Sequence, residues 1–157
     1  MKDDGGFVSK VRPGERAIDL PPAEDAALRF IGHIETPWRD PRDCPRRGDD
    51  ETGPIARVHL DPLWQPALAG IEAFERLQLF YWMHLARRDL VSQTPGHTGV
   101  ARGAFALRSP VRPNPIASSV VKLVRVEGAM LEVRGLDCVD GTPLLDIKPV
   151  HGGGAKP

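Results

Sequence analysis

A basic stretch extends from Leu90 to Val126, a part of the chain that contains no acidic residue. Its cations are Arg102, Arg108, Arg112, Lys122 and Arg125. Prolines flank Arg108 and Arg112 and restrict their loop, so less conformational entropy is lost when this loop orders around a ligand. Because a guanidinium donates parallel hydrogen bonds to a carboxylate or a phosphate, the stretch predicts an anion-binding site. The alternative is a set of solvated arginines without a ligand.

Three aspartates lie among apolar residues and turn formers between residues 136 and 149, namely Asp137, Asp140 and Asp146. The dipeptide Asp140-Gly141 is typical of a turn in which the carboxylate caps backbone N–H groups. Asp146 lies in a strand that we expect to be buried, and Lys148 follows on the same side of that strand. A structural ion pair and a catalytic pair are both open for Asp146 and Lys148.

Other patterns that carry chemistry are missing from the sequence. The five histidines show no ligand spacing, so no metal site is expected. There is no G-x-G-x-x-G motif and no P-loop, so a nucleotide would have to be held in another way. The segment from His151 to Gly154 resembles an esterase oxyanion loop, but without a G-x-S-x-G motif a flexible chain end is expected.

Short β-rich runs predict the elements that position these residues. The clearest signal is a hairpin formed by residues 119–126 and 129–136 around Glu127-Gly128. Residues 77–85 alternate in polarity and predict a strand buried on both faces, with a continuing helix as the competing interpretation. Further strands are expected at 30–34, 55–60, 100–107 and 142–147, a short helix at 66–74, and a polar loop at 87–99.

The composition favours a single, mainly β domain. The chain has 157 residues with 16 glycines and 16 prolines, which disfavours an all-helical bundle. We expect a small β-barrel or sandwich with one or two short helices over residues 29–150. Residues 1–28 are expected to form a flexible arm and residues 151–157 a disordered tail.

Charge, hydropathy and cysteine content exclude several classes of protein. Lys and Arg number 21 and Asp and Glu number 21, which excludes a generally basic nucleic-acid-binding coat. The most apolar stretch, Leu77–Ala86, is too short to span a membrane, and the charged first ten residues do not form a signal peptide. Cys44 and Cys138 are far apart in the sequence and fit no metal or redox spacing. A reduced, cytoplasmic protein without a membrane partner is therefore expected.

Three segments taken together resemble the TsaA-like, or TrmO, family. They read G-A-F-A-L-R-S-P-V-R-P-N-P-I at 103–116, G-L-D at 135–137 and D-G-T-P-L-L-D-I-K-P at 140–149. Supporting matches lie at 31–37, at 44–48 and at 70–85. The resemblance covers about residues 29–150.

The resemblance implies a small β-barrel that binds S-adenosylmethionine as a homodimer. It also implies methylation of N6 of threonylcarbamoyladenosine, next to the anticodon of certain tRNAs. Two alternatives remain open: the same barrel methylating a small molecule or another RNA, and a non-catalytic S-adenosylmethionine-binding module.

The resemblance also assigns site residues by motif. The cofactor contacts it implies are Arg46, Arg47, Gly48, His84, Leu85, Ala86, Arg108, Ser118, Arg134, Gly135, Leu136 and Asp137. Asp140 or Asp137 is the hypothesised acceptor of the N6 proton, since methyl transfer depends mainly on alignment but that proton must still leave. Arg112, Asn114 and Lys148 are assigned to RNA phosphate or to the threonyl carboxylate of the substrate.

Overall fold

The computed structural model describes residues 10–152 of the chain. The chain divides into two compact units, which are described separately. The barrel unit comprises residues 28–82 and, from residue 117 onward, the rest of the described chain. The insert unit comprises the described residues up to Ala27 together with residues 83–116.

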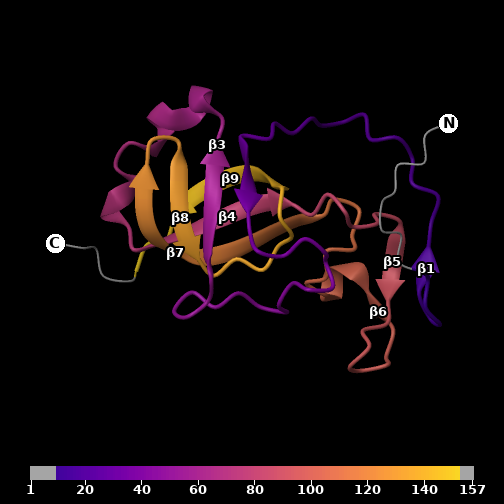
Figure 1. Cartoon of the computed structure of the whole chain (residues 1–157). Coiled ribbons are helices and arrows are strands. Elements are labelled where there is room, and N and C mark those ends of the chain that lie inside the picture. Colours follow the sequence, from indigo (N-terminus) through magenta and orange to yellow (C-terminus); the bar gives the residue numbers. More distant parts are fainter. Residues whose placement is uncertain (1–9, 153–157) are drawn as a thin grey trace. The chain divides into compact units, whose positions relative to one another are not determined.

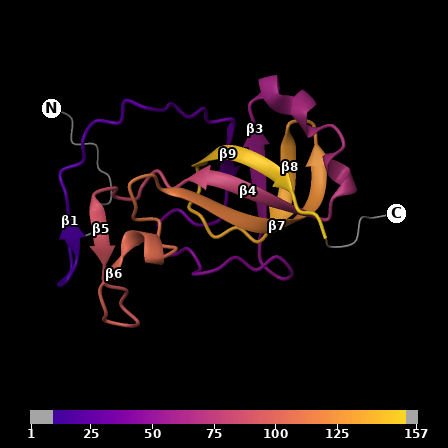
Figure 2. The ribbon, with the colours of Figure 1, turned by 180° about the vertical axis from the view of Figure 1, so that it is seen from behind.

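Six strands of the barrel unit close into a barrel in the order β2-β3-β8-β7-β4-β9 (Figures 1 and 2). Their bounds are β2 Gly32–Glu35, β3 Ile55–Leu60, β4 Arg76–Trp82, β7 Ile116–Glu127, β8 Met130–Arg134 and β9 Thr142–Pro149. The pairing of β2 with β9 closes the barrel, and full closure leaves none of these strands as a free edge. The mainly β barrel expected from the sequence is confirmed.

Alternating side chains of these strands fill the barrel. In β4, Leu77, Leu79 and Tyr81 are buried while the residues between them are half-buried. This strand is therefore fully buried on one face only, and the predicted burial of both faces is wrong, because the closed barrel leaves the outer face of β4 partly in solvent. The other fully buried side chains of the core include Ile34, Val58, Val121, Leu131 and Leu144. Each such side chain stabilises the fold by about 1.5–3 kcal/mol.

The hairpin predicted around Glu127-Gly128 is confirmed by β7 and β8. Glu127 pairs with Met130, and Gly128 has a φ of 59°, which glycine adopts without steric cost. The register shifts between Leu123 and Arg125, which is the mark of a β-bulge in the long strand β7.

The short helix predicted for 66–74 is present, divided into two 3-10 helices. Two 3-10 helices, η1 (Pro62–Leu68) and η2 (Ile71–Ala73), occupy this region. Pro66 lies inside η1 and cannot donate a backbone hydrogen bond, and Gly70 between the helices has a φ of 85°. These two residues prevent one continuous α-helix.

A small sheet with the order β1-β5-β6 forms the regular part of the insert unit. Its strands are β1 Arg16–Ala17, β5 Leu90–Gln93 and β6 Arg102–Gly103, and the 3-10 helix η3 (Ala104–Ala106) follows β6. The strand predicted for 100–107 is thus wrong beyond β6, and the predicted polar loop at 87–99 contains β5. β5 escapes prediction because a strand this short is held by its pairing partners and carries little hydrophobic alternation.

The predicted division into arm, barrel domain and tail stays a prediction. Residues 1–9 of the predicted arm and 153–157 of the predicted tail lie outside the described residues. Within residues 10–28, β1 pairs with β5 through Arg16 and Ser92. No helix in the described part of the chain is long and apolar enough to cross a membrane.

Candidate functional site

Two segments that the sequence assigns to the cofactor meet in the barrel unit. The carbonyl oxygen of Gly135 lies where a side chain at Gly48 would begin, so a Cβ at Gly48 would overlap it. Gly135 has a φ of 110° and lies against Asp50 and the backbone of Val120. Only glycine allows this close backbone approach. The loop at 46–48 and the segment 134–137 therefore form one surface.

Ion pairs attach the loop beyond Gly48 to the barrel. The Arg76 guanidinium on β4 donates to Asp50 at 3.0 Å and to Glu51 at 2.9 Å. The Lys122 ammonium on β7 also donates to Glu51, at 3.0 Å. These pairs are partly exposed, so solvent screening keeps each contribution to stability small. Together they fix the loop from two neighbouring strands.

Arg134 also attaches this loop to the barrel. Its guanidinium donates to the carbonyl oxygen of Gly53 at the end of the loop. The side chain assigned to the cofactor from the sequence thus holds the protein backbone here.

Asp49 gives the loop its own internal order. Its carboxylate accepts hydrogen bonds from the Thr52 hydroxyl and from the backbone N–H groups of Glu51 and Thr52. The bond from the Thr52 side chain, followed by those from the backbone, lowers the pKa of Asp49 to about 2. Between Asp49 and Gly53 the loop is therefore a structured turn.

Arg46 and Arg47 remain available at this surface. Both are exposed, and neither makes a hydrogen bond or an ion pair with any residue between 10 and 152. Exposed guanidinium groups next to a fixed backbone suit the capture of a carboxylate.

Asp137 accepts a hydrogen bond from Tyr81, whose hydroxyl also lies against Ser119. The Tyr81 hydroxyl donates to Asp137 Oδ1 at 3.0 Å and lies 2.8 Å from the Ser119 hydroxyl. Burial, followed by the charge of Asp137, raises the pKa of Tyr81, so the phenol stays protonated. Sequence reasoning gave Tyr81 and Ser119 no role. The available signal was that Tyr81, the single tyrosine of the chain, lies on the inward face of a strand, where its hydroxyl needs a partner.

Asp140 links the turn before β9 to the segment that follows β2. Its Oδ1 accepts from the backbone N–H of Thr36 at 3.1 Å, and its own N–H donates to the Trp38 carbonyl at 2.7 Å. The next residue, Gly141, donates to the carbonyl of Ile34 in β2. The carboxylate of Asp140 thus caps an N–H of a distant segment, whereas the Asp-Gly dipeptide predicts capping within its own turn, and the proton-accepting role of Asp140 stays a prediction.

The remaining barrel residues assigned to the cofactor differ in exposure. Leu136 is buried, so its side chain packs in the core. Ser118 on β7 is half-buried, and its hydroxyl accepts from Gln78 at 3.5 Å.

Four more cofactor candidates belong to the insert unit. His84, Leu85 and Ala86 lie in the turn after β4, in which the Ala86 N–H donates to Met83 at 3.0 Å. Arg108 is exposed in the proline-rich loop.

The substrate candidates Arg112 and Asn114 take part in organising that proline-rich loop. Arg112 donates to the carbonyl oxygens of Leu107 and Ser109 at 3.1 and 3.2 Å. Arg88, which sequence reasoning missed, donates to the carbonyl of Pro113 at 2.6 Å and to the Asn114 side chain at 3.3 Å. No pattern around Arg88 signals this role, because it depends on a loop 25 residues away.

Lys148 pairs with Asp146 at 3.2 Å, as in the first of the two alternatives that their spacing leaves open, and a catalytic role of the pair stays a hypothesis. The ammonium also lies 5.9 Å from the ring of Phe80. The expected burial of Asp146 is wrong, because its side chain is 52% exposed on the outside of β9.

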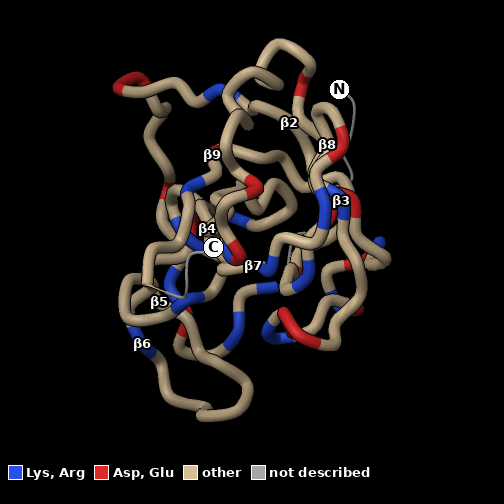
Figure 3. Tube along the Cα trace, turned by 90° about the vertical axis from the view of Figure 1, so that its left-hand side faces the viewer, with Lys and Arg blue, Asp and Glu red and all other residues tan. Residues whose placement is uncertain are grey.

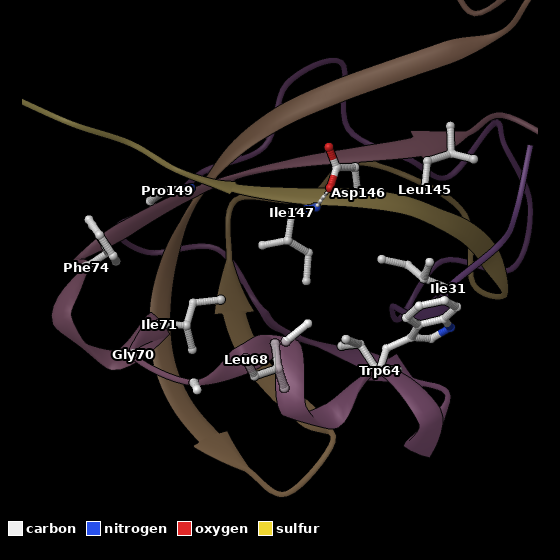
Figure 4. Close-up of a pocket in the computed structure, with 13 residues that line it drawn as sticks. Ile31, Trp64, Leu68, Gly70, Ile71, Phe74, Leu145, Asp146, Ile147 and Pro149 are labelled. Carbon is white, nitrogen blue, oxygen red and sulfur yellow. Dashed lines mark hydrogen bonds between the residues drawn. The ribbon is translucent and has the colours of Figure 1, made fainter.

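An apolar pocket of about 400 Å³ lies between the 3-10 helices and β9 (Figure 4). Trp64 and Leu68 face Ile31 and Ile147 across it. Its carboxylate, Asp146, is already paired with Lys148. Apart from Asp146, none of the candidate residues named from the sequence lines this pocket.

Neither cysteine is activated as a nucleophile. Burial, followed by the charge of Asp137, raises the pKa of Cys44, and burial raises the pKa of Cys138 to about 12. Both are free thiols. Within residues 10–152, no group of three or more His, Cys, Asp or Glu is placed to hold a metal ion.

The six-stranded barrel, with two loops that meet through the backbones of Gly48 and Gly135, defines a class of small β-barrel domains. Comparison with known proteins identifies the family. The model of the tRNA-methyltransferase O N-terminal domain matches residues 33–152. The chain belongs to this family.

Relatives carry two kinds of name. A protein of Rhizobium radiobacter named "Probable S-adenosyl-L-methionine-binding protein VirR" is 50% identical over 90% of this chain and 80% of its own length. A "tRNA (adenine(37)-N6)-methyltransferase" of Escherichia coli is 36% identical over 76% of this chain and 55% of its own length.

A solved structure confirms the fold. The "Crystal structure of TrmO" superposes with a TM-score of 0.67 and 30% identity, over 81% of this chain and 58% of that chain. The chain thus spans somewhat more than half the length of this structure and of the Escherichia coli enzyme.

Proposed function

We propose that this chain binds S-adenosylmethionine on the surface formed by residues 46–48 and 134–137. The observation that carries the proposal is the backbone contact between Gly48 and Gly135, which joins two loops that the family resemblance assigns to the cofactor. The 50% identity to a protein named as a probable S-adenosylmethionine-binding protein supports the same conclusion.

The residues on this surface fit the chemistry of the ligand. S-adenosylmethionine carries a carboxylate, which Arg46 or Arg47 would hold, and two cationic groups, which a carboxylate such as Asp137 would attract. Backbone groups at Gly135 and Leu136 would serve the polar edge of the adenine. When bound, the ligand supplies a methyl group on a positively charged sulfur.

Calorimetric titration of the purified chain with S-adenosylmethionine tests the proposal. We expect Arg46→Ala and Asp137→Asn each to raise the Kd by at least about tenfold, because a charge-assisted hydrogen bond contributes about 1.5–3 kcal/mol. Arg125→Gln is the matched control, since Arg125 is an exposed arginine that pairs with Glu127 and Glu132 on the hairpin. The absence of binding by the unmodified chain would overturn the proposal.

A second candidate function is methyl transfer to N6 of threonylcarbamoyladenosine beside the anticodon of tRNA. The 36% identity to a tRNA (adenine(37)-N6)-methyltransferase favours it. Of the two candidate proton acceptors, Asp137 is favoured because it belongs to the 134–137 segment of the proposed cofactor surface, whereas Asp140 accepts from the Thr36 N–H at the end of β2. Arg112, Asn114 and Lys148 would contact the RNA or the threonyl carboxylate.

Incubation of the chain with labelled S-adenosylmethionine and tRNA that carries threonylcarbamoyladenosine tests this candidate. Label in the modified nucleoside supports it, with at least a hundredfold loss expected for Asp137→Asn. Cofactor binding without transfer to this tRNA would favour another RNA or a small molecule as methyl acceptor, or a non-catalytic S-adenosylmethionine-binding module. Homodimer formation and a cytoplasmic location also stay predictions, and light scattering tests the first.

A further inference from the structure

Phe105 on η3 is unusually exposed for an aromatic residue. Its side chain is 81% accessible, the largest value among the exposed large hydrophobic residues of the described chain, while its neighbour Ala104 is buried. The short helix therefore turns its small residue inward and its large ring to solvent. Single exposed apolar residues are common, so exposure alone assigns no function.

The positive charge of Arg102, close to Phe105 in the chain, favours an anionic binding partner. Arg102 on β6 precedes Phe105 by three residues and is exposed, and its side chain makes no hydrogen bond or ion pair with a residue in the described range. Chain geometry keeps the two Cα atoms within about 11 Å of each other. The loop between β5 and β6 carries no charge, and the first charge after it is the cation at β6 (Figure 3). The nearest acidic residues in the sequence are Asp89 and Glu127, and in the fold Glu15 accepts from the Thr94 N–H, one residue beyond the partner of Arg102 in β5.

We infer that Phe105 and Arg102 form a platform for an unpaired nucleotide of RNA, with the base stacked on the ring and the phosphate held by the guanidinium. An aromatic face accepts any base, and an unpaired arginine beside it supplies the charge that a phosphate needs. Val100, at 58%, is also exposed in this segment, but a protein-docking patch would require a wider apolar area than these two side chains. The inference rests on the RNA substrate proposed above as the second candidate function.

The test uses an anticodon stem-loop RNA with the fluorescent base 2-aminopurine beside the anticodon. Stacking on Phe105 quenches this base, and we expect Phe105→Ala to abolish the quenching and weaken binding by about 5- to 100-fold. Phe105→Trp should restore both signals. Arg102→Gln should reduce the slope of log K against log salt concentration by about one, because one phosphate contact is lost.

Leu63→Ala is the matched control, because Leu63 on η1 is also highly exposed, at 71%, and lies in the barrel unit. The inference is overturned if the RNA does not bind, if Phe105→Ala binds it normally, or if Leu63→Ala loses as much affinity. It is also overturned if Phe105→Ala loses RNA only through a change of oligomeric state measured by light scattering.

Calorimetry with S-adenosylmethionine separates this inference from the proposed function. Phe105→Ala should retain the cofactor affinity of the unmodified chain, and a parallel loss would assign the residue to the cofactor site and overturn the inference. An unmodified chain that quenches the RNA probe but does not bind S-adenosylmethionine would overturn the proposed function alone.

Discussion

Gly48 and Gly135 are in contact through their backbones, and a side chain at Gly48 would occupy the position of the Gly135 carbonyl oxygen. This contact joins a loop that precedes β3 to the segment that follows β8, although 87 positions separate the two residues in the sequence (135 − 48). The surface proposed for S-adenosylmethionine depends on it.

The substitution Gly48→Ala should disrupt both stability and cofactor binding. The methyl group must displace backbone atoms, and overpacking of this kind costs about 1–3 kcal/mol of unfolding free energy. Thermal unfolding and calorimetry measure the two effects. Gly103→Ala is the control, because a Cβ there meets no atom within 4 Å, and an equal loss in both variants would contradict the role of the Gly48 contact.

The substitution Arg76→Gln should release the 49–53 loop and leave the barrel folded. Arg76 bonds Asp50 and Glu51, and these pairs are screened by solvent, so we expect a small change in the midpoint of thermal unfolding. Faster amide hydrogen exchange at residues 49–53 and several-fold weaker binding of S-adenosylmethionine should accompany it. Arg57→Gln removes comparable exposed pairs with Glu35 and Glu132, and unchanged exchange at 49–53 is expected there.

The hydrogen-bonded turn at Asp49 should remain intact as the pH is lowered below 3.8. Folding lowers the pKa of Asp49 from 3.8 to about 2, so the folded chain binds fewer protons than the unfolded chain over this range. The stabilisation from Asp49 is thus fully present above pH 3.8 and is lost as the pH falls through about 2. The amide shifts of Glu51 and Thr52 in NMR spectra report the titration. A midpoint near 3.8 would contradict the hydrogen bonds assigned to Asp49.

The substitution Tyr81→Phe should remove the hydrogen bond to Asp137 without opening a cavity. A buried hydrogen bond contributes about 0.5–1.5 kcal/mol, and urea unfolding should show a loss of this size. Because the released carboxylate is free to move, we also expect weaker S-adenosylmethionine binding. Leu79 lies two residues before Tyr81 on the same inward face of β4. Leu79→Ala should lower the free energy of unfolding by about 2–5 kcal/mol and provides the comparison for a packing defect.

The sequence predicts the elements of this fold where the hydrophobic pattern is strong. Residues 55–60 and the hairpin around Gly128 are found as predicted, because their side chains alternate between the core and solvent. The 3-10 form at 62–73 and the strand β5 were missed. The first depends on Pro66 and Gly70, and the second on pairing with β1 and β6, which no local pattern records.

The family motifs predict which segments form the candidate site, but they do not predict which side chains contact one another there. The resemblance names Gly48 and Gly135, and the structure supplies the reason that both are glycine. Tyr81, Ser119, Arg76 and Arg88 were missed because their roles come from residues distant in the sequence. Arg134, in turn, was assigned to the ligand, and its guanidinium holds the Gly53 carbonyl.

The closure of the barrel sets an order of events during synthesis of the chain. β9 pairs with both β2 and β4, and Ile34 of β2 lies opposite Thr142 of β9. Among the barrel strands, only the β7–β8 hairpin can form from neighbouring residues, and such local contacts form faster than distant ones. On the ribosome, β2 therefore waits for its second partner until β9 has left the exit tunnel, with one edge of the nascent sheet uncovered until that moment.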